Sequence, residues 1–204
     1  MKKRFKLFAV LSMITLTITA LLAGCGGGGS DFQYVKNDGG TLTITSYSGS
    51  DTEVVVPASI NGTAVTAIGD RVDKNGYVSS VFDTNARITK VSLPDTIKSI
   101  RNDAFRNMSH LNSIVIPDGV NTIGFSAFQN CTELTSITIP KNVTTISSSA
   151  FAYCSKLASV YFEGNAPQMG DVVFDSTAPG LIIYYHNGAS GFTNPWHNIR
   201  TATY

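Results

Sequence analysis

Two cysteines, Cys131 and Cys154, have the most reactive side chains in the body of the chain. They lie 23 positions apart and occupy the same place in a repeated segment. If successive copies of this segment stack as paired strands, equivalent residues lie about 4.8 Å apart and point the same way. Their Cβ atoms are then beyond the disulfide range of roughly 3.5 to 4.5 Å. We therefore expect two buried free thiols rather than a disulfide. A metal site is a weaker alternative, since neither a CxxC pair nor a histidine accompanies them.

The other residue types that carry out catalysis are present without a pattern. The three histidines, His110, His186 and His197, fall in no spacing that a metal site or a nucleophile relay requires. No phosphate-binding GxxxxGK[ST] loop occurs. The acidic residues are scattered through turns, whereas catalysis would need a buried pair with a shifted pKa. The sequence therefore predicts no cofactor, no metal and no enzymatic activity, and a hydrolase is the weakest functional alternative.

The first residues have the pattern of an export signal. Four basic residues among the first six precede an apolar stretch over residues 7–22. This stretch is short for a membrane helix, which needs about 20 predominantly apolar residues. It ends in Leu22-Ala23-Gly24-Cys25, which resembles the bacterial lipobox, where the signal is cut before a cysteine that becomes lipidated. We expect a signal peptide over residues 1–24 and a lipid anchor at Cys25; an ordinary secretory signal is the alternative.

The mature chain would begin with a flexible tether. Residues 25–38 are predicted as the lipidated cysteine and this tether, because a run of glycines can bury nothing. Removing residues 1–24 takes away four of the 15 basic residues and none of the 14 acidic ones, which leaves a formal net charge of −3. Nucleic-acid binding requires a concentrated basic surface, so this class of partner is excluded. We expect a protein that is exported to the bacterial cell envelope, surface-exposed, and attached to the membrane through its lipid anchor only.

A period of 23 positions organises the rest of the chain, with four copies that follow one another without a gap over residues 88–179. The first position of the copies holds Ile88, Leu111, Leu134 and Leu157, and the eighteenth holds Phe105, Phe128, Phe151 and Phe174. A unit of this size buries its apolar side only by stacking on its neighbours, so the period predicts a repeat solenoid. Each copy opens with an alternating segment that predicts a short strand ended by proline. The Ala-Phe segment is too short for an independent helix, and we expect a single helical turn there.

The repeated pattern also resembles a known family. The pattern LxxIxIPxxVxxIGxxAFxxC, clearest in Leu111–Cys131 and Leu134–Cys154, resembles the BspA-like, or treponemal-type, class of bacterial leucine-rich repeats. This resemblance covers residues 39–204. It implies a right-handed coil of short strands and single helical turns, and it implies adhesion or protein interaction only loosely, since a shared solenoid does not define a ligand.

The leucine-rich-repeat domain over residues 39–204 is expected to have three parts. Residues 39–87 form an N-terminal cap and a degenerate first repeat with two insertions, in which Val81-Phe82 takes the place of Ala-Phe. The four regular repeats follow, and residues 180–204 form a C-terminal cap. Trp196 in this cap resembles the tryptophan of the family's closing segment.

Two surfaces are candidates for binding. The outward strand positions form a concave ribbon about four rungs wide: Lys90, Ser92, Ser113, Val115, Ser136, Thr138, Ser159 and Tyr161. The second candidate is the insertion over residues 70–80, which carries Arg71, Lys74 and Tyr77, because long loops in compact repeats tend to carry function.

These surfaces lead to a hypothesis of adhesion to a protein of a host or a neighbouring cell. Glycan capture is the alternative, with Tyr161, Tyr77 or Trp196 as a stacking platform. A ribbon that is merely solvated remains open as well.

Overall fold

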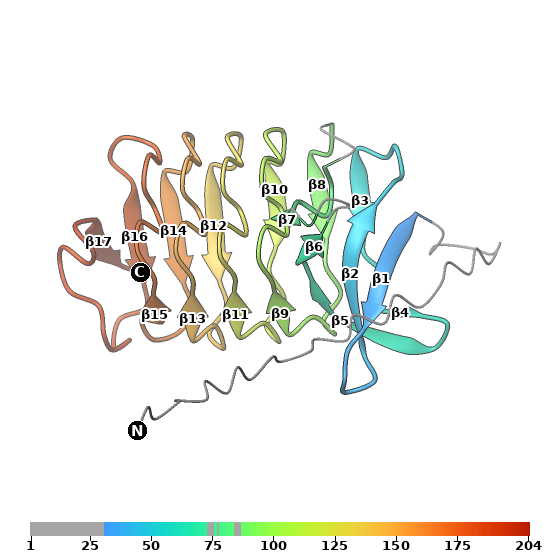
Figure 1. Ribbon diagram of the computed structural model, residues 1–204. Coiled ribbons are helices and arrows are strands. Elements are labelled where there is room, and N and C mark those ends of the chain that lie inside the picture. Colours follow the sequence, from blue (N-terminus) through green and yellow to red (C-terminus); the bar gives the residue numbers. More distant parts are fainter. Residues whose placement is uncertain (1–30, 73–75, 77, 84–86) are drawn as a thin grey trace, which may run out of the picture.

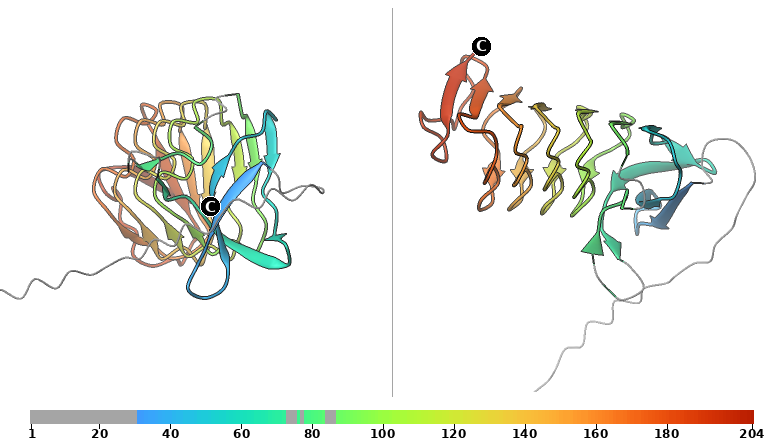
Figure 2. Two further views of the ribbon diagram at one scale, coloured as in Figure 1. Left: turned by 45° about the vertical axis from the view of Figure 1, so that its right-hand side comes forward. Right: turned by 90° about the horizontal axis from the view of Figure 1, so that it is seen from above.

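The computed structural model describes residues 31–72, 76, 78–83 and 87–204 of the chain. The predicted signal peptide and Cys25 lie outside these residues. The described chain winds into coils that stack along one axis, with β1 and β2 at one end of the stack and β17 at the other (Figures 1 and 2). The fold class is therefore the predicted repeat solenoid.

One side of the coils forms a row of parallel strands. They are β3 (Glu53–Val55), β8 (Lys90–Ser92), β10 (Ser113–Val115), β12 (Ser136–Ile139), β14 (Ser159–Phe162), β16 (Ile182–Tyr185) and β17 (Arg200–Thr203). We call the outward side of this row the strand face. Residues that pair between β12 and β14, and between β14 and β16, are 23 positions apart. Strand β16 therefore continues the repeat, although the sequence placed it in the C-terminal cap.

A second side of the coils forms a continuous sheet. Its parallel strands are β2 (Leu42–Tyr47), β5 (Thr63–Ile68), β9 (Ser99–Ile100), β11 (Thr122–Ile123), β13 (Thr145–Ile146) and β15 (Gln168–Met169). Strand β1 (Phe32–Lys36) pairs with β2 in the antiparallel direction, and β4 (Ser59–Ile60) forms a hairpin with β5. The prediction of a flexible tether over residues 25–38 is therefore wrong for its second half, which contains β1. Phe32 is buried, and its strand gives the open edge of β2 a partner.

The third side of the coils consists of turns, and here the expected helical turn is replaced. Phe105 N–H donates to Ala127 O and Phe128 N–H donates to Ala150 O, both at 2.7 Å, so these amides bond to the next coil. The turn containing Phe105 also has two residues in the left-handed region, Asp103 (φ 54°) and Asn107 (φ 62°). A helical turn would direct its N–H groups back along its own axis. Among the described residues no helix forms, because bonding between coils takes these groups instead.

A column of aromatic rings runs through the core beneath these turns. The rings of Phe82, Phe105, Phe128, Phe151 and Phe174 stack in sequence, with centroids 4.9 to 5.6 Å apart. Tyr47 and Phe32 extend the column into the N-terminal cap. Phe82 occupies the position of the repeated phenylalanine, as the degenerate first repeat predicted. The column thus joins cap and repeats into one hydrophobic core.

The C-terminal end of the core is closed by aromatic side chains. Trp196 is buried and meets Phe162 edge-on at a centroid distance of 5.4 Å, with Phe192 against its other side. Without this cover the last coil would expose its apolar interior, which is why solenoids require caps. Trp196 is consequently not exposed as a stacking platform, contrary to the suggestion from the sequence.

Replacing Phe128 by Ala should lower the free energy of unfolding by about 3 to 5 kcal/mol, because it leaves a cavity in the middle of the column. Phe125→Ala is the matched control, since Phe125 lies in the same turn and is 48% exposed. Thermal and denaturant unfolding of both variants measures the difference. Equal melting temperatures for the two variants would contradict the role given to the column.

Asp103 should make stability depend on pH in the acidic range. Its side chain is buried beside Arg106 at 3.0 Å, and burial raises its pKa above the ordinary value of 3.8 even though Arg106 opposes the shift. The folded state therefore binds this proton more tightly than the unfolded chain does. Relative to Asp103→Asn, which also tolerates a left-handed backbone, the unmodified protein should gain stability as the pH falls from neutral toward 3.8. Unfolding of both proteins across this range tests the sign, and a constant or reversed difference would refute it.

Candidate binding surface

The predicted ribbon positions lie on the strand face. Lys90, Ser113, Val115, Ser136 and Thr138 are exposed. Three further members of the predicted set are half-buried: Ser92, Ser159 and Tyr161. The alternation follows from the strand geometry, because neighbours such as Val91 and Val160 point into the core. The outward placement is as predicted, while a role in binding stays a prediction.

The strand face carries an aromatic cluster at its C-terminal end. Tyr161 on β14 stacks on Tyr184 on β16, with centroids 4.9 Å apart and an angle of 13° between the rings. Tyr204 meets Tyr161 edge-on at 5.7 Å and is 48% exposed. We call these three residues the tyrosine cluster. Burial raises the pKa of the Tyr204 hydroxyl, and the nearby negative charge of Glu163 adds to this shift.

Sequence reasoning included only the first tyrosine of this cluster. Tyr184 pairs with Tyr161 in the regular register of the repeat, so extending the repeat by one strand would have found it. Tyr204 lies outside the repeat register, and it approaches Tyr161 because it directly follows β17, which pairs with β16 in the parallel direction. No sequence pattern in the repeats indicates that contact.

The side chains of His186 and Glu163 flank the tyrosine cluster. His186 Nε2 lies 3.2 Å from a carboxylate oxygen of Glu163, and the His186 ring packs against Tyr204 at a centroid distance of 4.4 Å. The side chains of His186 and Glu163 are 47% and 44% exposed, so the pair contributes little to stability. The pair places a carboxylate and a ring nitrogen beside the partly exposed ring of Tyr204.

The strand face is interrupted in its middle. Strands β3, β8 and β10 form one sheet and β12, β14, β16 and β17 form another, and no strand pairing joins β10 to β12. The same two coils remain bonded on their other sides, through β11 and β13 and through Phe128 and Ala150. The interruption is therefore a local opening and not a boundary between domains. The predicted ribbon of four rungs therefore has this opening between its second and third strands.

A cleft of about 390 Å³ lies at the interruption. Its walls are the facing strands, with Ser113 and Val115 on one side and Ser136 and Thr138 on the other. Ile114 is only partly buried at its base, whereas its equivalents in the neighbouring coils are fully buried. Asp118 and Glu163 also line the cleft. The charged residues that line it are therefore all acidic.

The inserted loop is a small hairpin apart from the strand face. Strands β6 (Arg71–Val72) and β7 (Val78–Ser79) pair in the antiparallel direction. Arg71 is half-buried, donates to Ser80 O at 3.2 Å and lies 3.6 Å from Asp83, so its guanidinium is engaged within this segment. Lys74 and Tyr77, the other two predicted loop residues, lie outside the described residues.

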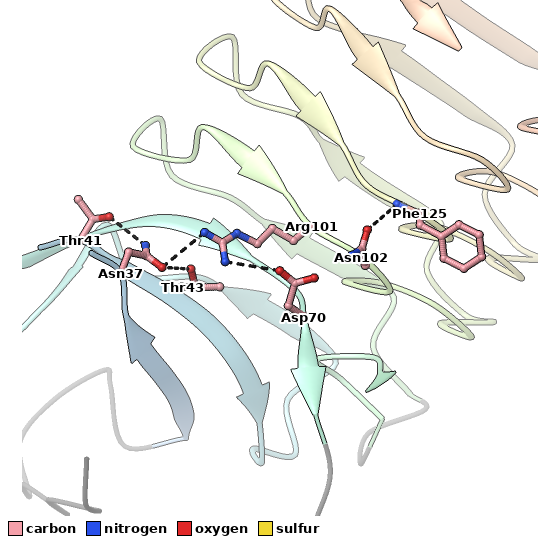
Figure 3. Close-up of polar contacts among 7 residues, drawn as sticks. All are labelled: Asn37, Thr41, Thr43, Asp70, Arg101, Asn102 and Phe125. Carbon is pink, nitrogen blue, oxygen red and sulfur yellow. Dashed lines mark hydrogen bonds and ion pairs between the residues drawn. The ribbon is translucent and has the colours of Figure 1, made fainter. Parts of the chain in front are cut away.

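A polar network joins the N-terminal cap to the first regular repeat (Figure 3). The Arg101 guanidinium contacts Asp70 Oδ2 and Asn37 Oδ1, each at 3.4 Å. Asn37 Oδ1 also accepts from the Thr43 hydroxyl at 2.8 Å, and Asn102 Oδ1 accepts the amide of Phe125 at 2.9 Å. The Arg101 contacts therefore connect the cap to the first repeat, and the separate Asn102 bond joins the first repeat to the second.

The two cysteines are free and fully buried, as expected. The thiol of Cys131 donates to Phe105 O at 3.2 Å, and that of Cys154 donates to Phe128 O at 3.1 Å. Burial raises the pKa of Cys131 well above its ordinary value and raises the pKa of Cys154 to about 12. The described residues contain no group of three or more side chains suited to a metal ion. They also contain no helix with the length and apolar character to cross a membrane.

These features define the class of the protein: a stacked repeat solenoid with a row of parallel strands on one side. The chain belongs to the BspA-type leucine-rich repeat family. The model of the family's repeat region matches residues 78–188 in six copies, which is more than half of the chain. The fold and the family together make the chain a repeat protein-interaction module.

Solved structures of bacterial leucine-rich repeat proteins share the fold. The leucine-rich repeat protein TpLRR of T. pallidum is 24% identical with a TM-score of 0.66, over 85% of this chain and 79% of that one. A leucine-rich cell surface protein of Faecalibacterium prausnitzii is 26% identical with a TM-score of 0.52, over 81% of this chain and 49% of that one. The pneumococcal vaccine antigen PcpA is 17% identical with a TM-score of 0.50, over 79% of this chain and 49% of that one, a likeness of fold alone. No curated protein matches the chain.

The buried thiols should not react with a disulfide reagent in the native protein. In a chain carrying Cys25→Ser, a thiol-reactive chromophore at mildly alkaline pH should label no cysteine until the protein is unfolded, when both should react. The physical reason is that the reactive thiolate is disfavoured by burial at both positions. Labelling of the native protein within minutes would contradict the burial of the pair.

Proposed function

We propose that the protein is an exported, lipid-anchored surface protein that binds another protein through its strand face. The observation that carries this proposal is the tyrosine cluster on the strand face, where Tyr204 is 48% exposed and Tyr161 and Tyr184 are half-buried. Tyrosine is enriched among residues that dominate binding energy at interfaces, because it offers a rigid apolar surface with a polar end. Val115, 76% exposed on the same face, adds a second apolar contact toward the N-terminal end.

Two features support display at the cell surface. The lipobox-like segment Leu22-Ala23-Gly24-Cys25 supplies an anchor, and the glycines after Cys25 supply a short spacer. A similar solved protein, from Faecalibacterium prausnitzii, is described as a cell surface protein. The partner proposed is accordingly a protein on a host or neighbouring cell, and the activity is binding rather than catalysis.

Glycan capture is the second candidate function, and the tyrosine cluster favours it as well. Stacked rings can present a platform to the apolar face of a sugar, and Glu163 and His186 beside them could bond to its hydroxyl groups. The mainly small polar residues of the remaining strand face suit either class of ligand. The two functions therefore have to be separated by experiment.

The double substitution Tyr161→Ser with Tyr184→Ser should weaken binding to target cells by about 30-fold or more, since a hot-spot residue contributes at least about 2 kcal/mol. The matched control is Tyr153→Ser, because Tyr153 is 52% exposed in a turn and a serine, Ser176, occupies the equivalent position one coil further on. Binding of the fluorescently labelled protein to intact cells measures the effect. Equal losses in both variants would argue against the strand face.

Pretreatment of the target cells separates the two candidate partners. Digestion of surface proteins should abolish binding, whereas periodate oxidation of surface glycans should leave it unchanged. The reverse result would replace protein binding by glycan capture.

Lipid anchoring should depend on Cys25 alone. When the chain is expressed in a bacterium that processes lipoproteins, mass spectrometry should find an N-terminal peptide that begins with a diacylated Cys25. Cys25→Ser should release the protein from the membrane fraction. An unmodified N-terminus at any other residue would refute the anchor.

A further inference from the structure

We infer that the cleft between β10 and β12 binds the guanidinium group of an arginine side chain presented by the protein partner. This inference rests on the proposed function and specifies one element of the partner. It starts from the interruption of the strand face between β10 and β12. Elsewhere on this face, neighbouring strands use their main-chain groups to pair with each other.

The interruption leaves main-chain donors and acceptors available within the strand face. Where the row is intact, Ala158 N–H donates to Thr135 O at 2.9 Å and Glu163 N–H donates to Ile139 O at 3.0 Å. One coil earlier, Thr135 makes no such bond to Asn112, and Pro140, which occupies the position of Glu163, has no N–H to donate. A ligand that enters here meets carbonyl oxygens that the neighbouring strand does not use.

The charge of the lining selects the ligand. Asp118 and Glu163 are its charged members, and neither a lysine nor an arginine is among them. The lining therefore favours a cation over an anion, and the Lys98 ammonium beside Gly119 lies outside it. The side chain of Asp118 is exposed, and Glu163 already holds His186 on its other side. Glu163 thus lies between the cleft and the tyrosine cluster, which makes the two one continuous surface.

The shape and the donor count favour guanidinium over ammonium. A guanidinium is planar and presents five N–H donors in a fixed arrangement, so it can enter a slot between two strands and donate to carbonyl and carboxylate oxygens together. The aliphatic part of an arginine side chain would contact Val115 and the partly exposed Ile114. Asn142 Nδ2 donates to Asp118 O at 2.8 Å and ties the two coils together at this end of the cleft.

The test uses blocked tripeptides, acetyl-Gly-X-Gly-amide, with arginine, lysine, citrulline or glutamate at X. Citrulline has nearly the shape of arginine without its charge. In the full chain, nuclear magnetic resonance should show saturable shifts for the arginine peptide at the amides of Ile114, Ile116, Ser136 and Thr138. The arginine peptide should bind most tightly. The dissociation constants for lysine and citrulline should be higher by about tenfold or more, because these side chains lose the charge-assisted bidentate bonds.

Substitutions in the lining give the second arm of the test. Asp118→Asn together with Glu163→Gln should weaken binding of the arginine peptide by about tenfold or more, since each change removes a charged acceptor. The matched control is Asp95→Asn, because Asp95 is the exposed equivalent of Asp118 one coil earlier, where the strands are paired. Equal melting temperatures show that the variants fold. Shifts spread over the whole surface, equal affinity for lysine or citrulline, or equal losses in lining and control variants would each overturn the inference.

Failure of this inference can be distinguished from failure of the proposed function. If the arginine peptide does not bind while Tyr161→Ser with Tyr184→Ser still abolishes binding to protein-bearing cells, the cleft assignment fails and protein binding stands. If the peptide binds as expected but cell binding resists surface proteolysis, the partner is not a protein and the inference fails with the proposed function.

Discussion

The whole structure depends on a constraint of register: each coil has to place the same kind of side chain above its equivalent in the previous copy of the repeat. Parallel pairing between the coils fixes this register on two sides, and the turn amides fix it on the third. Once it is fixed, a phenylalanine in one coil can only stack on the phenylalanine of the next, and the column of rings follows. The same constraint controls the strand face, where each outward residue lies beside the equivalent residues of the adjacent repeats. Tyr161 and Tyr184 are stacked for this reason and need no further explanation.

The features that could be predicted from the sequence are those that register alone determines. The apolar columns, the outward strand positions, the buried cysteines and the place of Phe82 all follow from counting along the repeat period, because each contact joins equivalent positions. The same count along the repeat would have identified Tyr184 as the equivalent of Tyr161. The prediction missed it because the segment after residue 179 was assigned to a cap, although β16 pairs with β14 in the regular register.

The features that could not be predicted arise where register is not the deciding factor. The Ala-Phe segment was expected to form a helical turn, but its amides bond to the next coil, and a single repeat considered alone does not reveal that competition. Strand β1 was assigned to a flexible tether because the glycine run precedes it, yet burial of Phe32 and pairing with β2 order it. The contact of Tyr204 with Tyr161 depends on the path of the closing segment. The missing pairing between β10 and β12 has no signal in the repeats, which are among the most regular at that point.

This opening can persist because each coil is held on three sides. Between the coils of β10 and β12, the β11–β13 pairing and the turn amides remain, and Asn142 Nδ2 donates to Asp118 O at 2.8 Å. A solenoid can therefore lose the bonds of one side without losing its stacking, since nearest-neighbour contacts on the other sides maintain the interface. In a simple two-stranded arrangement the same loss would separate the strands. The repeat architecture thus permits a local departure on the strand face, and such a departure is where a repetitive surface can acquire a contact that its neighbouring coils do not share.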